Sequence, residues 1–193
     1  MSRHSLKKGR ALLCAAVLIG AGLTTSAMAG DVKLAAKGKS NCVIVVPPGT
    51  MAEDVKFDRK HKDYLERIAE IKRQLLRDSA KDLALYLGKM SGAEFEVVEA
   101  LPKGDRRTPI YVGTPAQKVF GPVGISKAKM FGFRVVADAK RGIGLYGESE
   151  HGTSYAIYEL LHRLGCRWYM PTELGEVVPR QPTLTVPAMD VKL

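Results

Sequence analysis

The sequence predicts an α/β two-layer sandwich, an α+β arrangement in which two or three helices pack on one face of a mixed β-sheet. Three observations support this fold class. The β-branched run CVIVVP at residues 42–47 is typical of a buried strand. Apolar residues recur at helical spacing over 58–90 and again over 150–164. Between these helices, two short apolar runs joined by a turn predict a hairpin at 131–146.

The first 29 residues have the pattern of a secretory signal peptide. Basic residues precede an apolar stretch, Ala11 to Leu23, which is shorter than the roughly 20 residues of a membrane span. The small-x-small triplet Ala27-Met28-Ala29 follows it as a cleavage site. We therefore expect residues 1–29 to be removed and the protein to be exported, to a periplasm or beyond, with no membrane contact after cleavage.

Length and charge exclude some classes of protein. The chain has 193 residues and a formal net charge of +10, of which the signal segment carries four positive charges. What remains suits one domain with a real core, and is far short of the roughly 250 residues of a (β/α)₈ barrel. The other basic residues are mixed with acidic ones, as in the segment 58–78. Such mixing is typical of a solvated helix face, so we expect no nucleic-acid partner.

The N-terminal half divides into a strand and a long helical region. Residues 30–41 are polar, and we expect them to be frayed. The strand at 42–47 ends at Pro47-Pro48-Gly49, and the helical region follows to about residue 90. Ser79 with Asp82 resembles a capping box, which predicts a break near residue 78. A glycine, Gly88 or Gly92, would end the second part.

The C-terminal half predicts short strands and one amphipathic helix. Strands are expected at 94–99 and 110–112, and a loop with a helical turn at 114–130. The hairpin pairs 131–137 with 142–146. The following helix carries one apolar stripe and ends at Gly165, which is placed to adopt the left-handed conformation. The stripe consists of Ile157, Leu160, Leu161 and Leu164.

Two cysteines follow the signal segment, Cys42 and Cys166. In an oxidising compartment such a pair could form a disulfide. Two separate buried thiols is the alternative that we favour, because sequence does not show that a strand start and a helix end meet.

The segment GIGLYG at 142–147 matches G-x-G-x-x-G. A dinucleotide-binding loop must follow a strand and open a helix, whereas Ile143 and Leu145 alternate as strand residues within the motif. Glycines that allow close packing in a hairpin explain the motif better. We expect no nucleotide and no other cofactor.

Glu148, Glu150 and His151 form a candidate acid–base group at a strand-to-helix turn. The favoured alternative is that these acids stabilise the N-terminus of the helix through its dipole. The sequence contains neither H-E-x-x-H nor C-x-x-C, and its histidines are widely separated, so no metal site is expected. We assign no catalytic residue.

Arg167, Trp168 and Tyr169 follow the end of the helix directly. Three interpretations remain open for them. The aromatic rings could fill the core below the helix, anchor a second domain, since aromatics and arginine favour interface centres, or stack against a sugar ring.

Four segments together resemble a known family, and the last is the most specific: CVIVVP, LALYLGKMSGAEFEVV, PIYVG and GIGLYGESEHGTSYAIYELLHRLGCRWYMPTELGEVVP. The chain is similar here to the N-terminal accessory domain of secreted bacterial glycoside hydrolases, namely α-glucuronidases, β-N-acetylhexosaminidases and uncharacterised hydrolase-like proteins. The resemblance covers residues 41–187, and we expect residues 30–187 to form one domain of this kind.

The resemblance implies a non-catalytic α/β sandwich that precedes a catalytic (β/α)₈ barrel. Residues 188–193 would then begin the linker to that barrel, the expected partner in cis. Residues 51–78 depart from the family pattern as a charged helical insertion. The leading hypothesis is an accessory domain in polysaccharide degradation. The alternatives are a stand-alone carbohydrate-binding module and, less favoured, a small hydrolase using Glu148 and His151.

Overall fold

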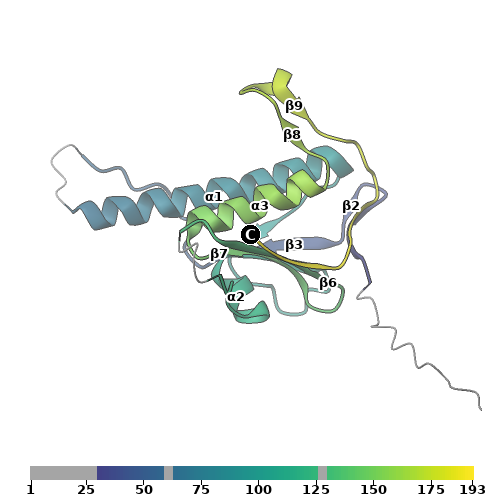
Figure 1. The fold of residues 1–193 in the computed structure, drawn as a ribbon, viewed down its shortest axis with the longest axis horizontal. Helices are drawn as coiled ribbons and strands as arrows, with labels where there is room; N and C mark the ends of the chain where they lie inside the picture. The colour runs from purple at the N-terminus through teal and green to yellow at the C-terminus, as the bar shows by residue number, and fades with distance from the viewer. Residues whose placement is uncertain (1–29, 59–62, 126–129) are drawn as a thin grey trace, which may run out of the picture.

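The protein folds as a two-layer α/β sandwich, which confirms the predicted fold class (Figure 1). The computed structural model describes residues 30–58, 63–125 and 130–193. The expected signal peptide, 1–29, lies outside these residues. Among the described residues, no helix has the length and hydropathy that a membrane span requires.

A six-stranded mixed sheet with the order β11-β6-β7-β5-β3-β4 forms the centre of the domain. Its parallel part consists of β3 (Cys42–Val45), β4 (Val97–Val98), β5 (Thr108–Val112) and β7 (Gly142–Gly147). The strand β6 (Phe133–Asp138) pairs antiparallel with both β7 and β11 (Met189–Lys192). The predicted strand at 42–47 and the predicted hairpin are therefore confirmed.

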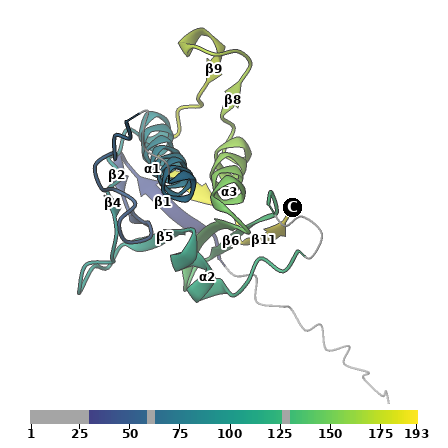
Figure 2. The same ribbon diagram turned by 90° about the vertical axis from the view of Figure 1, so that its left-hand side faces the viewer.

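Two long helices, α1 (Tyr64–Ser91) and α3 (Glu150–Arg163), lie side by side on one face of this sheet (Figure 2). Their apolar stripes bury Leu83, Leu87, Ile157 and Leu161 against the strands. The short helix α2 (Thr114–Phe120) covers the other face, where Phe120 packs near Tyr146. The strand β7 is consequently buried along its whole length.

Capping explains where the long helices begin and end. The Asp63 carboxylate accepts hydrogen bonds from the first backbone N–H groups of α1, and Gly92 ends that helix in the left-handed conformation. Ser149 caps α3 in the same way, and Gly165 follows its end with φ of +102°. The predicted ends at Gly92 and Gly165 are confirmed.

The predicted helix break near residue 78 is wrong, because α1 is continuous through it. The Ser79 hydroxyl lies 2.8 Å from the Leu75 carbonyl oxygen and 2.8 Å from the Ser154 hydroxyl of α3. Asp82 accepts a hydrogen bond from the Tyr158 hydroxyl at 2.6 Å. Both polar side chains thus link α1 to α3 rather than cap a new helix.

The prediction that residues 30–41 are frayed is wrong. They form β1 (Val32–Ala36) and β2 (Lys39–Ser40). Together with β10 (Leu184–Val186) they make a three-stranded antiparallel sheet. Alternating burial explains the strand: Val32 and Leu34 point into the core, while Lys33 between them is exposed.

The C-terminal segment also differs from expectation. Residues 188–193 were expected to begin a linker, whereas β11 lies within them as an edge strand of the main sheet. Leu193 exchanges two backbone hydrogen bonds with Phe133, at 2.9 and 3.0 Å. Backbone pairing of this kind leaves little trace in side-chain pattern, since Asp190 and Lys192 are exposed.

The segment between α3 and β10 forms a hairpin that projects from the domain beyond α1 and α3 (Figure 1). It pairs β8 (Arg167–Trp168) with β9 (Glu176–Val177), and the short 3₁₀ helix η1 (Glu173–Gly175) lies at its tip. We call residues 167–177 the projecting hairpin.

The contact between β7 and α3 yields a test of the fold. A Cβ atom added at Gly147 would lie 2.3 Å from the backbone carbon of Gly152. We expect Gly147→Ala to lower the free energy of unfolding by about 1–3 kcal/mol or more, because backbone must shift to admit the methyl group. Urea unfolding followed by circular dichroism measures this. Gly30→Ala is the control, since nothing lies within 4 Å of that position; equal effects of the two would contradict the packing.

Candidate functional site

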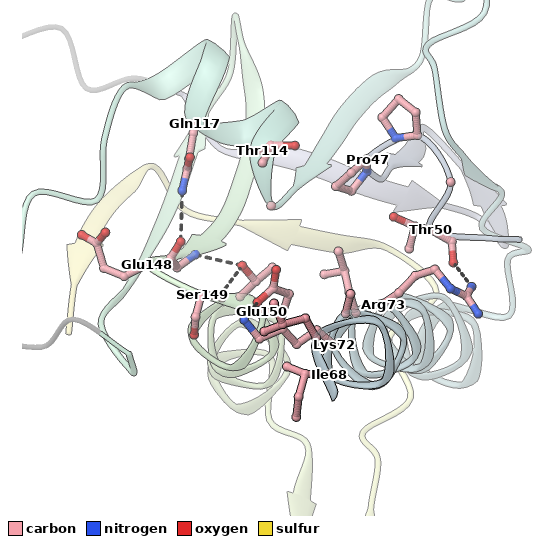
Figure 3. A pocket seen from close by; sticks show the side chains of 18 residues that line it. Pro47, Thr50, Ile68, Lys72, Arg73, Thr114, Gln117, Glu148, Ser149 and Glu150 are labelled. Carbon is pink, nitrogen blue, oxygen red and sulfur yellow. Dashed lines mark hydrogen bonds and ion pairs between the residues drawn. The ribbon is translucent and has the colours of Figure 1, made fainter. Parts of the chain in front are cut away.

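A pocket of about 860 Å³ opens at the carboxyl ends of β3, β5 and β7 (Figure 3). We call it the strand-end pocket. Its walls are the loop after β3 (47–50), the start of α2 (113–117), the start of α3 (147–153) and the first half of α1 (65–76). The three strands are parallel, so the loops that follow them meet at one edge of the sheet.

The position of this pocket follows from the topology. The chain leaving β3 continues into α1 on one face of the sheet, and the chain leaving β5 continues at once into α2 on the other. β7 leads back to the first face through α3. Neighbouring strands whose connections run to opposite faces leave a crevice at their carboxyl ends, where open α/β sheets bind ligands.

The polar lining of the strand-end pocket carries balanced charge. The Lys72 ammonium lies 3.6 Å from the Glu150 carboxylate, across the gap between α1 and α3 (Figure 3). The Gln117 side-chain amide donates to the Gly147 carbonyl oxygen at 3.0 Å, which ties α2 to the end of β7. Thr114 adds an exposed hydroxyl at the start of α2.

An ion pair between the half-buried Arg73 and the buried Glu70 fixes the α1 wall of the pocket. Arg73 donates to the Glu70 carboxylate at 2.6 and 2.8 Å and to the Thr50 carbonyl oxygen at 3.0 Å. These bonds from the Arg73 guanidinium lower the pKa of Glu70 to about 2. The charged insertion predicted at 51–78 therefore holds the loop after β3 against α1, as far as the described residues show.

The candidate acid–base residues do not come together as one group. Glu150 lies in the pocket beside Lys72, whereas the Glu148 side chain points away from that pair (Figure 3). His151 packs edge-on against Phe131, with 6.5 Å between the ring centroids. Within the described residues, no hydrogen bond joins His151 to either carboxylate.

Trp168 is held between the two long helices. Its ring makes edge contacts with Tyr86 of α1 at 5.0 Å and with Tyr158 of α3 at 5.7 Å between centroids. The indole N–H donates to the Tyr86 hydroxyl at 2.9 Å, and this hydroxyl donates to Glu176 at 2.5 Å. Lys89 also donates to Glu176, at 2.8 Å. Trp168 therefore anchors the projecting hairpin on the helices.

The neighbours of Trp168 have different positions. Arg167 donates to the His162 and Cys166 carbonyl oxygens at 2.6 and 2.7 Å, and so satisfies acceptors at the end of α3. The Tyr169 side chain is 75% exposed. With it, the hairpin exposes apolar residues that we had not singled out from the sequence: Met170, Leu174 and Val177.

The two cysteines are free and buried in the structure. The Cys166 sulfur lies 3.7 Å from the Met90 sulfur, and the Cys42 sulfur lies 3.7 Å from the Lys33 carbonyl oxygen. They thus take the favoured alternative of two separate thiols rather than the disulfide.

The motif GIGLYG lies within β7, as interpreted from the sequence. A Cβ atom at Gly144 would lie 2.6 Å from the Phe120 ring, so this glycine makes room for α2. Over the residues that the structure describes, no group of three potential metal ligands occurs.

Comparison with solved structures shows a likeness at the level of fold. The chain is similar to part of a solved structure titled a novel family GH115 4-O-methyl-α-glucuronidase, BtGH115A, with specificity for decorated arabinogalactans. The TM-score is 0.53 and the sequence identity 17%. The match covers 84% of this chain and 18% of that chain, so the chain shares its fold with a part of that structure and spans under a fifth of its length. No protein-family model matches, and no curated protein matches.

The anchor of the hairpin can be tested with Tyr86→Phe. The substitution removes the acceptor of the Trp168 indole and the donor to Glu176, so we expect a loss of about 1–3 kcal/mol of stability. Trp168 is the single tryptophan, so its emission should shift to the red as the hairpin loosens. Tyr64→Phe, at a 70% exposed position of α1, is the control. An unchanged emission spectrum for Tyr86→Phe would contradict the anchor.

The state of the thiols gives a second test. Burial raises the pKa of Cys42 to about 12 and also raises the pKa of Cys166. At pH 8 both are therefore protonated, and we expect iodoacetamide to leave them unlabelled in the native protein and to alkylate both in urea without a reductant. Mass spectrometry of the peptides locates the label. A pair that resists alkylation in urea until it is reduced would indicate a disulfide instead.

Proposed function

We propose that the protein is an exported, non-catalytic accessory domain of a carbohydrate-active glycoside hydrolase, which docks against a (β/α)₈ catalytic barrel. The likeness to part of a glucuronidase structure supports the glycoside hydrolase context. The observation that carries the docking role is the projecting hairpin, a fixed structure with an apolar, exposed tip.

Exposure and rigidity together favour docking by this hairpin. Leu174 is 91% exposed and Tyr169 75% exposed, and both stand away from the helices. Large apolar and aromatic side chains of this kind form the centres of protein interfaces. Trp168 and Glu176 hold the base of the hairpin, so little conformational entropy is lost when a partner covers its tip.

A stand-alone carbohydrate-binding module is the alternative. Tyr169 supports it, because an exposed ring can stack on a sugar. Trp168 supports it less, because Tyr86 and Tyr158 pack edge-on against its ring, although the residue stays 37% exposed. The third hypothesis, a small hydrolase using Glu148 and His151, loses support, since His151 packs against Phe131 and, within the described residues, no hydrogen bond joins it to Glu148.

The first experiment is to read the coding sequence beyond codon 193. We expect a continuation that encodes a barrel with paired carboxylates. Pull-down of that barrel, produced separately, then measures docking by this chain. Leu174→Ser should weaken the association about 10-fold, a typical effect at an interface centre.

The control is Leu101→Ser, at a 39% exposed leucine in a loop outside the hairpin. Equal affinities for the two variants would show that the hairpin is not the docking surface. Glycosidase activity of this chain alone would contradict the non-catalytic role.

A further inference from the structure

The strand-end pocket lies apart from the projecting hairpin. Its volume of about 860 Å³ is within the roughly 300–1,000 Å³ typical of small-molecule sites. No hairpin residue lines it. A partner that covers the hairpin therefore does not by itself account for the pocket.

The charge of the lining favours a neutral ligand. Lys72 and Glu150 compensate each other at 3.6 Å. The Arg73 guanidinium is already bonded to Glu70, and to the carbonyl oxygens of Thr50 and Ala52. A ligand with a net charge would leave that charge without a counter-charge in this lining, whereas a neutral ligand can add hydrogen bonds and no net charge.

The hydrogen-bonding groups suit a ligand with many hydroxyls. The Thr114 hydroxyl makes no hydrogen bond within the described residues and can donate or accept. The Gln117 carbonyl oxygen remains an acceptor, because its amide nitrogen is the atom bonded to Gly147. Glu150 and Lys72 supply an acceptor and a donor with further capacity.

The remaining walls are apolar. Ile68 and Leu76 of α1 and Pro47 after β3 face the same cavity. A pyranose or furanose ring combines hydroxyls at its rim with C–H groups on its faces. Such a ring can meet the polar start of α2 and α3 with its hydroxyls and the α1 side with its C–H groups.

We propose that the strand-end pocket binds a neutral sugar residue, with Thr114, Gln117 and the Lys72–Glu150 pair contacting its hydroxyls. This site is additional to the docking role and lies in a different part of the domain.

The test is titration of the ¹⁵N-labelled full chain with glucose, galactose, xylose and arabinose, and separately with glucuronate, followed by amide chemical shifts. We expect at least one neutral sugar to shift the amides of Thr50, Thr114 and Glu150 saturably, and glucuronate to bind more weakly. Thr114→Val keeps the shape of the side chain and removes its hydroxyl, so affinity should fall about 2- to 10-fold. Ala69→Phe, at an exposed position of the pocket wall, should weaken binding, because it places a ring where the sugar would lie.

Matched controls separate the site from general effects. Thr183→Val removes an exposed threonine hydroxyl outside the pocket, and Lys81→Phe adds a ring on an exposed part of α1 outside it. Both should bind as the unaltered chain does, and a thermal melt of each variant confirms that it is folded.

Three results would overturn the proposal. One is that no neutral sugar shifts these amides saturably. The others are that Thr114→Val and Thr183→Val lose sugar affinity equally, or that glucuronate binds more tightly than every neutral sugar. The docking role is judged separately, by the response of barrel binding to Leu174→Ser. Either proposal can thus fail while the other stands.

Discussion

The close contact between the end of β7 and the start of α3 is the constraint on which the rest of the structure depends. Gly147 and Gly152 meet without side chains, which seats α3 directly on the strand. The hydroxyl of Thr153 accepts a hydrogen bond from the Gly147 N–H, so the buried backbone donor at this turn also has a partner. That seating lets α3 lie beside α1, and the pair of helices then supports both the pocket and the hairpin.

Much of the fold could be predicted because its signals are local. The run at 42–47, the stripe from Ile157 to Leu164 and the glycines at helix ends each depend on neighbouring residues alone. The helix break near residue 78 was wrong because Ser79 and Asp82 bond to α3, a partner distant in the sequence. The strands β1 and β11 were missed for a related reason: backbone pairing with β10 and β6 stabilises them.

The candidate sites divide along the same line. Sequence could place Glu150 at a helix start and Trp168 after a helix end, but Lys72 is 78 positions away from Glu150, and only the topology brings them to 3.6 Å. The sequence left three interpretations of Trp168 open: a core residue, a domain interface or a sugar contact. Its partners Tyr86 and Tyr158 sit on separate helices, and no local pattern could have paired them with it. Exposed leucine in a short turn, as at Leu174, carries no sequence signal at all.

The continuity of α1 has a further consequence. One uninterrupted helix carries Lys72 on the pocket wall and Tyr86 below the hairpin, 14 residues apart, which at 1.5 Å per residue is about 21 Å. A break at residue 78 would have allowed a hinge between the pocket wall and the residues that anchor the hairpin. Because the helix is continuous, a partner bound to the hairpin is held at a fixed distance from the opening of the pocket.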